Sequence, residues 1–287
     1  MIHWYIIFKK VRKIHKMNKR ISIILPYYNR RPLLLKTLST FDIFYAQKNL
    51  EIIIVDDCSI KYHNIDDIPE LFPALNIKVI TLNKKTGINP CLPYNIGVKN
   101  STGEIIILSS PETLHVRNIF SVSNNFEELN YKSYLLFSVF CLTDKTLINN
   151  INTFSAKQII HTIHNNEKHF IEKLGEYGYP FNNSYGSWYL HPEYRRSGLN
   201  FLTAITRDAY YDMSGFDERF RFGTGYDDTE FKDRLENAGI NFKYYYDLIG
   251  IHVDHEIVNN SLPTTNLAIY ENSKIHPYMR NNLWGIL

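Results

Sequence analysis

The sequence predicts an α/β protein built on a doubly wound, mostly parallel sheet. Short aliphatic runs recur between amphipathic stretches, at residues 21–25, 52–55, 77–82 and 105–108. Runs of Ile and Val of this length are typical of parallel strands covered on both faces. The segment between the first two runs has apolar residues at helical spacing, namely Leu33, Leu34, Leu38, Phe41 and Phe44. A strand, helix, strand unit follows, and ligands bind such sheets at the carboxyl ends of their strands.

The composition limits the partners and the compartment. The 287 residues are 44% hydrophobic and 21% charged, with a formal net charge of +3. This charge is too small to indicate a nucleic-acid partner, and we expect one compact unit. The three cysteines form no C-x-x-C pair, so we expect buried inert thiols and a reducing, cytoplasmic location.

The N-terminal segment contains the one early apolar run, residues 2–8, followed by several lysines and arginines. The run is too short to cross a bilayer, so we expect no transmembrane segment. The basic residues allow two interpretations: a peripheral contact with an anionic membrane, or a frayed, solvated helix.

Polar residues follow the first two predicted strands. The first is followed by Pro26, Tyr28, Asn29 and Arg30, and the second by Asp56 and its neighbours. A G-x-G-x-x-G turn is missing from the sequence, which argues against a dinucleotide bound in the usual way. A flat base could instead stack on a tyrosine while an aspartate accepts a hydrogen bond from the ring. Alternatively, these residues only cap a turn and the next helix.

The fourth predicted strand ends at Ser110, Pro111 and Glu112, which provide one carboxylate where a ligand is expected. Beyond it we expect a strand at 134–142, a helix at 156–164 and an aromatic loop at 175–194 that contains Trp188. Aromatic rings with polar neighbours suit the apolar face and hydroxyl rim of a sugar, although the packing of a long loop explains the same composition.

Residues 215–239 contain the strongest chemical signal. We expect Asp227 to be the N-cap of a helix that ends at Gly239, with Glu230 completing a capping box. The helix N-terminus should keep both Asp227 and Asp228 ionised, and an ionised carboxylate can act as a general base toward a hydroxyl. Capping explains one aspartate and leaves the other without a role.

Two histidines, His252 and His255, follow another predicted strand that begins near residue 242. Residues three positions apart cannot both face one point from a straight strand. We therefore expect at most one of them to bind a metal.

These residues together resemble the family-2 inverting glycosyltransferases with the GT-A fold, from about residue 20 to residue 255. The segments that carry the resemblance are SIILPYYNR at 22–30, IVDDCS at 54–59, Asn83 with PYNIG at 93–97, GEIII at 103–107, and GFDERF at 215–220 with GYDDTEF at 225–231. The resemblance implies a Rossmann-like nucleotide-binding half with a mostly parallel central sheet, fused to a mixed α/β acceptor-binding half. We assign residues 20–115 to the first half and 116–258 to the second, between an N-terminal extension (1–19) and a C-terminal tail (259–287).

The resemblance also implies an activity: transfer of a hexosyl or N-acetylhexosaminyl group, with inversion, from a nucleotide sugar to a hydroxyl of a glycan or glycoconjugate. UDP is the expected nucleotide, ahead of GDP or dTDP. Asp228 matches the catalytic base, and the acceptor-binding residues are expected to be Asp227, Tyr226 and Trp188. The donor-binding residues are expected to be Pro26, Tyr28, Asn29, Arg30, Asp56, Asn95 and Ser110.

The metal motif departs from the family pattern. The family ends its fourth strand with Asp-x-Asp, whereas this chain has Ser110, Pro111 and Glu112. Glu112 and His252 are the expected ligands of Mn²⁺ or Mg²⁺, with mixed nitrogen and oxygen ligands favouring Mn²⁺. The missing aspartate motivates a second hypothesis, a catalytically inactive GT-A protein that binds a nucleotide sugar or glycan. A nucleotidyltransferase is less consistent with the sequence, because it usually has a glycine-rich phosphate loop.

Overall fold

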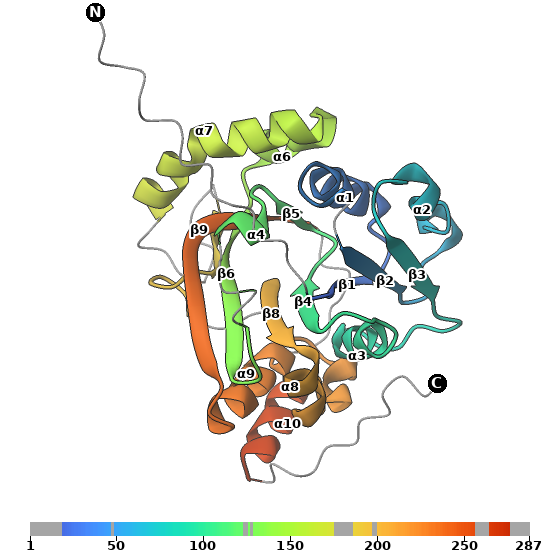
Figure 1. Cartoon of the computed structure of the whole chain (residues 1–287), viewed down its shortest axis with the longest axis vertical. Helices are drawn as coiled ribbons and strands as arrows, with labels where there is room; N and C mark the ends of the chain where they lie inside the picture. The colour runs from blue at the N-terminus through green and yellow to red at the C-terminus, as the bar shows by residue number, and fades with distance from the viewer. Residues whose placement is uncertain are drawn as a thin grey trace, which may run out of the picture.

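The computed structural model describes residues 19–46, 49–122, 126, 129–174, 186–196, 200–255 and 264–275. Within these residues the strands form one nine-stranded sheet in the order β3-β2-β1-β4-β8-β6-β9-β5, with β7 paired to β6 outside this path. Figure 1 shows helices packed around this sheet. The predicted α/β class is confirmed.

The first half of the sheet is parallel. Its strands are β1 (Ile21–Tyr27), β2 (Leu50–Asp56), β3 (Ile77–Thr81) and β4 (Ile105–Ser109). β1 pairs in parallel with β2 and β4, and β2 pairs in parallel with β3. The strands coincide with the four aliphatic runs, so these predictions are confirmed. The connecting helices are α1 (Arg31–Tyr45), the 3-10 turn η1 (Lys61–His63), α2 (Ile68–Leu71) and α3 (Cys91–Lys99).

The two faces of these strands bury separate apolar clusters. Ile23 packs in the same cluster as Leu38 of α1, whereas its neighbour Ile24 packs in the cluster of α3. Figure 1 shows α1 and α2 on one side of β1 to β3 and α3 on the other. Each such aliphatic side chain contributes about 1.5–3 kcal/mol by leaving water. Helix α3 approaches β1 closely because it has Gly97 at the contact, where a Cβ would clash with Ile24.

The second half of the sheet is mixed. Strand β8 (Leu202–Thr206) pairs antiparallel with β4, and β6 (Ser133–Leu142) pairs antiparallel with β8 and with β7 (Gly186–Leu190). The predicted strand at 134–142 is β6, and the predicted helix at 156–164 is the longer α7 (Ala156–Leu174). The expectation of one loop over 175–194 was wrong for residues 186–190, which form β7. Residues 175–185 lie outside the described residues.

Helices of the second half pack against both ends of this sheet (Figure 1). They are α4 (Ile119–Val122), α6 (Lys145–Thr153), α7, α8 (Arg207–Asp212), the 3-10 turn η2 (Glu218–Phe222), α9 (Asp227–Asn237) and α10 (Thr264–Ile275). Among the described helices, none has the length and apolar content needed to cross a bilayer. The apolar run at 2–8 lies outside the described residues.

The long strand β9 (Asn241–Val253) belongs to the second half of the sequence, and its last residues lie beside the segment that follows Glu112 in the first half. It pairs in parallel with β6 and antiparallel with β5 (Thr113–His115), with Thr113 opposite His252. This register brings His252 next to Glu112. The sheet thus continues across the expected boundary at residue 115, and the division into two halves stays a prediction.

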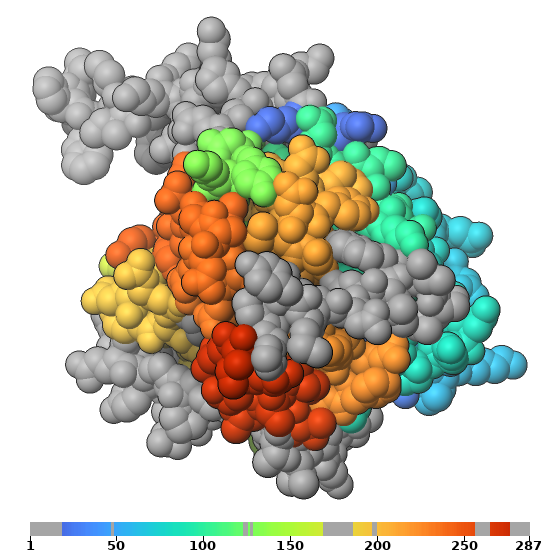
Figure 2. All heavy atoms as spheres, turned by 90° about the horizontal axis from the view of Figure 1, so that it is seen from below, coloured from blue at the N-terminus to red at the C-terminus, as the bar shows by residue number. Residues whose placement is uncertain are grey.

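Part of the expected C-terminal tail is helix α10, which contacts α9 and η2. Figure 2 shows it in red on the surface, beside orange residues of the preceding chain. Asn266 of α10 is fully buried, and its Nδ2 atom donates to the carbonyl oxygens of Phe220 and Gly225 at 3.0 and 2.8 Å. This contact fixes the loop that precedes α9.

Candidate active site

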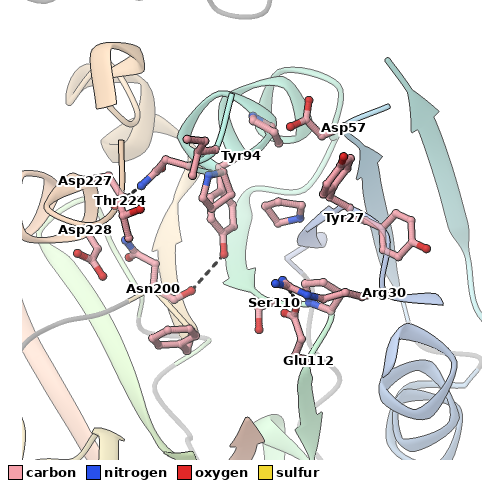
Figure 3. Close-up of a pocket in the computed structure, with 18 of the residues that line it drawn as sticks. Tyr27, Arg30, Asp57, Tyr94, Ser110, Glu112, Asn200, Thr224, Asp227 and Asp228 are labelled. Carbon is pink, nitrogen blue, oxygen red and sulfur yellow. Dashed lines mark hydrogen bonds and ion pairs between the residues drawn. The ribbon is translucent and has the colours of Figure 1, made fainter. Parts of the chain in front are cut away.

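A cavity of about 420 Å³ lies at the carboxyl ends of the central strands. Eight residues expected in the site line it: Pro26, Tyr28, Arg30, Ser110, Glu112, Asp227, Asp228 and His252. Figure 3 shows Asp227 and Asp228 on one side and Glu112 with Arg30 on the other, with Tyr94 and Asn200 between them. The convergence expected for Glu112, His252 and Asp228 is therefore present in the structure, while their roles stay predictions.

The end of the cavity near β2 contains an aromatic ring and a carboxylate. The Nζ atom of Lys85 lies 3.8 Å from the centroid of the Tyr28 ring and pairs with Asp57. Asp57 Oδ1 also accepts a hydrogen bond from the backbone N–H of Thr86 at 2.8 Å. This arrangement offers a ring face and a carboxylate to a flat ligand.

Asp56 does not line the cavity. The expectation that its carboxylate contacts the donor is therefore corrected. It is 2% exposed, and its Oδ1 accepts from the backbone N–H of Ser59 at 2.9 Å. Consecutive residues of an extended chain point to opposite sides, and Asp57 is the one that faces the cavity. Burial raises the pKa of Asp56, against hydrogen bonds from Ser59.

Asn29 is also placed differently from its donor-binding assignment. Its backbone is left-handed, with φ of 52°, and its Oδ1 accepts from the backbone N–H of Ile60 at 2.9 Å. Its own N–H donates to Ser59 Oγ at 2.9 Å. Asn29 therefore joins the loops after β1 and β2 and does not line the cavity.

The opposite end contains a cluster with the chemistry of a metal site. Ligand atoms of Glu112, His252 and His255 all lie within 4.8 Å of one another. The premise that the two histidines cannot face one point was wrong, because β9 ends at Val253 and His255 lies beyond the strand, where the alternation no longer applies. How many of them bind a metal stays a prediction. His115 lies elsewhere: it is fully buried, and its Nδ1 is 2.6 Å from the hydroxyl of Tyr45.

The protonation states in this cluster favour a cation. Burial of Glu112 opposes ionisation, but the adjacent charge of Arg30 is the largest of the effects that outweigh burial and lower the pKa of Glu112. Burial lowers the pKa of His252 to about 3, so its ring is neutral. A carboxylate oxygen and imidazole nitrogens are ligands that Mn²⁺ and Zn²⁺ accept, and their spacing fits one ion. Arg30 forms an ion pair with Glu112 in this structure.

The acid pair begins helix α9, but without the expected cap. The N-cap is Tyr226, with φ of 67° and no side-chain cap bond, and Asp227 is the first helical residue. The capping-box prediction was wrong, because Glu230 pairs with Arg234 at 2.6 Å. Asp227 Oδ1 instead accepts from Asn89 Nδ2 at 2.7 Å, and Asp228 Oδ1 accepts from the N–H of Thr229 at 2.8 Å.

The expectation that both acids are kept ionised was also wrong. Burial raises the pKa of Asp227, and it raises the pKa of Asp228 to about 7, with the charge of Asp227 adding to the effect. The cost of removing these carboxylates from water exceeds the stabilisation by the helix N-terminus, which is about 0.3–1 kcal/mol. A carboxyl group that titrates near neutral pH is suited to general-base chemistry.

Three further residues expected in the site lie outside the cavity lining. Asn95 is fully buried, and its side chain binds the backbone of Phe216 at 2.9 Å. Trp188 is also fully buried, 5.4 Å from Phe140 between ring centroids. Tyr226 stacks on Tyr270 of α10 at 5.4 Å. The expectation that these three side chains contact a ligand is therefore corrected, because each of them packs against other residues of the protein.

The structure adds residues that sequence reasoning missed. Tyr189, next to Trp188 on β7, lines the cavity and stacks on Phe201 at 4.4 Å. Strand alternation could have identified it once 186–190 was assigned as a strand. Asn200 lines the cavity too; its Oδ1 accepts from the hydroxyl of Tyr134 at 2.6 Å, and its buried Nδ2 has no partner within the described part of the chain. Asn200 lies just before β8, and no sequence motif around it indicated a place in the site.

Comparison with known proteins agrees with this geometry. Residues 22–110 match the model of glycosyl transferase family 2. Two relatives, uncharacterized glycosyltransferases of Rickettsia conorii and Rickettsia felis, are each 30% identical over 112 residues. The match covers 39% of this chain and 18% of each relative, so the chain spans less than a fifth of their length.

Three solved structures resemble the chain over nearly its whole length. GalNAc-T7 with UDP, GalNAc and Mn²⁺ has a TM-score of 0.61 at 12% identity, covering 90% of this chain and 48% of that one. The mannosyltransferase PcManGT of Pyrobaculum calidifontis, with GDP-Man and Mn²⁺, has a TM-score of 0.54 at 15% identity, covering 92% and 66%. TarS 1–349 of S. aureus with UDP has a TM-score of 0.57 at 15% identity, covering 90% and 72%.

At these identities the structures establish the fold, and the family match covers the strands that form the donor end of the cavity. The chain therefore has the GT-A fold, and its residues 22–110 are similar to glycosyl transferase family 2.

Proposed function

We propose that the protein is an inverting, metal-dependent glycosyltransferase that moves a sugar from a nucleotide-sugar donor to a hydroxyl of a glycan or glycoconjugate. One observation supports this most: Asp228 lines the same cavity as Tyr28 and Asp57 at one end and the Glu112, His252 and His255 cluster at the other. A base-binding end, an anionic metal-binding group and a general base are the three parts that such a transfer requires.

The donor end suits a nucleotide. A base would stack on Tyr28, and Asp57 would accept a hydrogen bond from the ring. UDP is the preferred nucleotide, since UDP is bound in the structures of GalNAc-T7 and TarS, although PcManGT was solved with GDP-Man.

Glu112, His252 and His255 would hold the divalent cation. Two imidazoles with one carboxylate favour Mn²⁺ over Mg²⁺, which prefers oxygen ligands. When bound, the ion supplies positive charge opposite the diphosphate that leaves the sugar.

Asp228 is the proposed base. Its carboxylate accepts the proton of the acceptor hydroxyl as that oxygen forms a bond to the anomeric carbon and the bond to the diphosphate oxygen breaks. The attack comes from the face opposite the leaving group, so the configuration inverts. Asp227, which accepts a hydrogen bond from Asn89, would orient the acceptor's other hydroxyls.

The test is release of nucleoside diphosphate from a panel of nucleotide sugars with Mn²⁺. Asp228→Asn should abolish turnover and leave donor binding intact, because it keeps the shape of the side chain and removes the base. Asp247→Asn, an exposed acid on β9, is the matched control. Normal turnover in Asp228→Asn would remove Asp228 from the mechanism.

A second candidate is a non-catalytic protein that binds a nucleotide sugar or glycan. The ion pair between Arg30 and Glu112 favours it, because an internal cation already neutralises the carboxylate that a metal would use. Tight binding of UDP without turnover of any donor would support this function over catalysis.

The cytoplasmic location is a proposal as well. Cys58, Cys91 and Cys141 are all free, which fits a reducing compartment. Contact between the basic N-terminus and a membrane concerns residues outside the described part of the structure.

A further inference from the structure

Arg30 occupies an unexpected position for a residue at the mouth of a metal site. It follows β1 directly and stands at the N-cap position of α1. Its Nη1 donates to Glu112 Oε1, the same oxygen that lies 3.8 Å from His255 Nε2. Figure 3 shows the guanidinium beside the Glu112 carboxylate at the cavity wall. The Glu112 carboxylate is therefore shared by a guanidinium and by the cluster that fits a metal.

The two side chains of this ion pair differ in their exposure to solvent. The Glu112 side chain is 3% exposed, whereas the Arg30 side chain is 27% exposed. A buried carboxylate without a partner is costly, so a cation must accompany Glu112 when no metal is bound. Arg30 provides that cation, and its exposure toward the cavity lets it leave without unfolding its surroundings.

A divalent ion and the guanidinium cannot both use Glu112 without cost. Both would use the Glu112 carboxylate, and two positive groups held beside one carboxylate repel each other. A released guanidinium would be next to the place where a donor diphosphate meets the metal. Its planar set of N–H donors matches phosphate oxygens in pairs.

We propose that Arg30 is an exchangeable counter-ion: it pairs with Glu112 in the free protein, a divalent cation displaces it, and it then binds the diphosphate of the donor. The last step rests on the proposed function, whereas the competition between Arg30 and the metal does not. Metal alone binds weakly because it must break the ion pair. Nucleoside diphosphate gives the displaced guanidinium a new partner, so metal and diphosphate strengthen each other's binding reciprocally.

The test compares Arg30→Met with Arg31→Met. Arg31 is the next residue, and its ion pair with Asp67, at 2.6 Å, lies at the surface away from the cavity. Mn²⁺ alone is titrated into each protein by calorimetry and by loss of the free Mn²⁺ electron paramagnetic resonance signal. We expect Arg30→Met to bind Mn²⁺ about tenfold more tightly than the wild type, from loss of a partly exposed competing ion pair. Arg31→Met should bind it as the wild type does.

The second half of the test uses UDP at saturating Mn²⁺. Arg30→Met should bind UDP about tenfold more weakly, because the charge-assisted hydrogen bonds to phosphate are lost. Arg30→Lys keeps the charge without the paired donors, and its Mn²⁺ affinity should lie between those of the wild type and Arg30→Met. This variant also serves if Arg30→Met does not fold.

The outcomes separate the two hypotheses. Unchanged or weaker Mn²⁺ binding in both Arg30 variants would overturn the competition. Tighter Mn²⁺ binding with unchanged UDP affinity would overturn the diphosphate step. If the wild type binds Mn²⁺ but no nucleotide, the proposed donor is wrong. The Mn²⁺ titrations of the Arg30 variants then still decide whether Arg30 competes with the metal for Glu112.

Discussion

Replacing Asp228 by Asn should stabilise the folded protein above neutral pH, even though it removes the proposed base. Burial raises the pKa of Asp228 from 3.8 to about 7, so the folded protein binds this proton more tightly than the unfolded chain does. Protonation therefore favours folding, and the stabilisation from it is complete at low pH and lost as the pH rises through 7. At pH 8 the wild type contains an unfavourable, partly buried charge that the Asn variant lacks.

The structure sets the size of this effect. A difference of about three pKa units corresponds to roughly 4 kcal/mol. Asp228 is only partly buried and faces the cavity, and solvent screening reduces the effect to about 2 kcal/mol. For a chain of this size, 1 kcal/mol shifts the melting temperature by roughly 2–4 °C. We expect Asp228→Asn to melt about 4–8 °C above the wild type at pH 8.

Thermal unfolding at pH 8 and pH 5, without metal or nucleotide, measures this. At pH 5 the carboxyl is protonated in the folded protein but largely ionised in the unfolded chain, so the advantage of the Asn variant should fall to about 40% of its value at pH 8. Asp247→Asn should leave the melting temperature unchanged at both values of pH. An advantage of equal size at pH 5 and pH 8, or a loss of stability at pH 8, would show that burial of the Asp228 charge does not control its pKa.

Three further predictions concern ligand binding and turnover. Turnover should fall about tenfold for each pH unit below 7, because protonated Asp228 cannot accept a proton; a pH-rate profile that is flat from pH 5 to 8 would contradict this. Tyr28→Ala should weaken UDP binding by about 1–3 kcal/mol through loss of base stacking, measured by calorimetry, whereas Tyr62→Ala, at a residue that is 83% exposed, should have no effect. Asn200→Leu should lower kcat/KM for the donor about tenfold, because Asn200 lines the cavity and Leu can neither donate nor accept a hydrogen bond there. UDP affinity should stay unchanged in that variant, and donor kinetics equal to those of an exposed control, Asn165→Leu, would argue against the contact.

Much of the fold could be predicted because its signals are local. The aliphatic runs at 21–25 and 105–108 are strands β1 and β4, since a strand buried on both faces must be apolar at every position. The apolar spacing in 31–47 likewise predicted α1, which ends at Tyr45. Polar residues that follow parallel strands converge at one edge of a sheet, so the positions of Tyr28, Ser110 and Glu112 in one cavity also follow from local pattern.

The errors at the site arose where a side chain's direction depends on distant packing. Asp56 and Asp57 are adjacent residues of the same type, so the sequence cannot distinguish them. Only the position of the loop after β2 shows that Asp57 faces the cavity. Trp188 and Tyr189 differ in the same way, because on β7 the side chain of Trp188 faces the core and that of Tyr189 faces the cavity. Adjacent residues of a strand exchange faces with a shift of one position, which the sequence of a short strand does not reveal.

The sequence alone was sufficient to predict the fold class, the resemblance to glycosyl transferase family 2 and the convergence of Asp228 with Glu112 and His252. The addition of His255 to this group, the ion pair of Arg30 with Glu112 and the neutral-range pKa of Asp228 required the folded molecule. Each of these depends on groups far apart in the chain and on how much water their contact excludes. Hydrophobic pattern is a property of neighbouring residues, whereas the energy of a buried charge depends on everything packed around it.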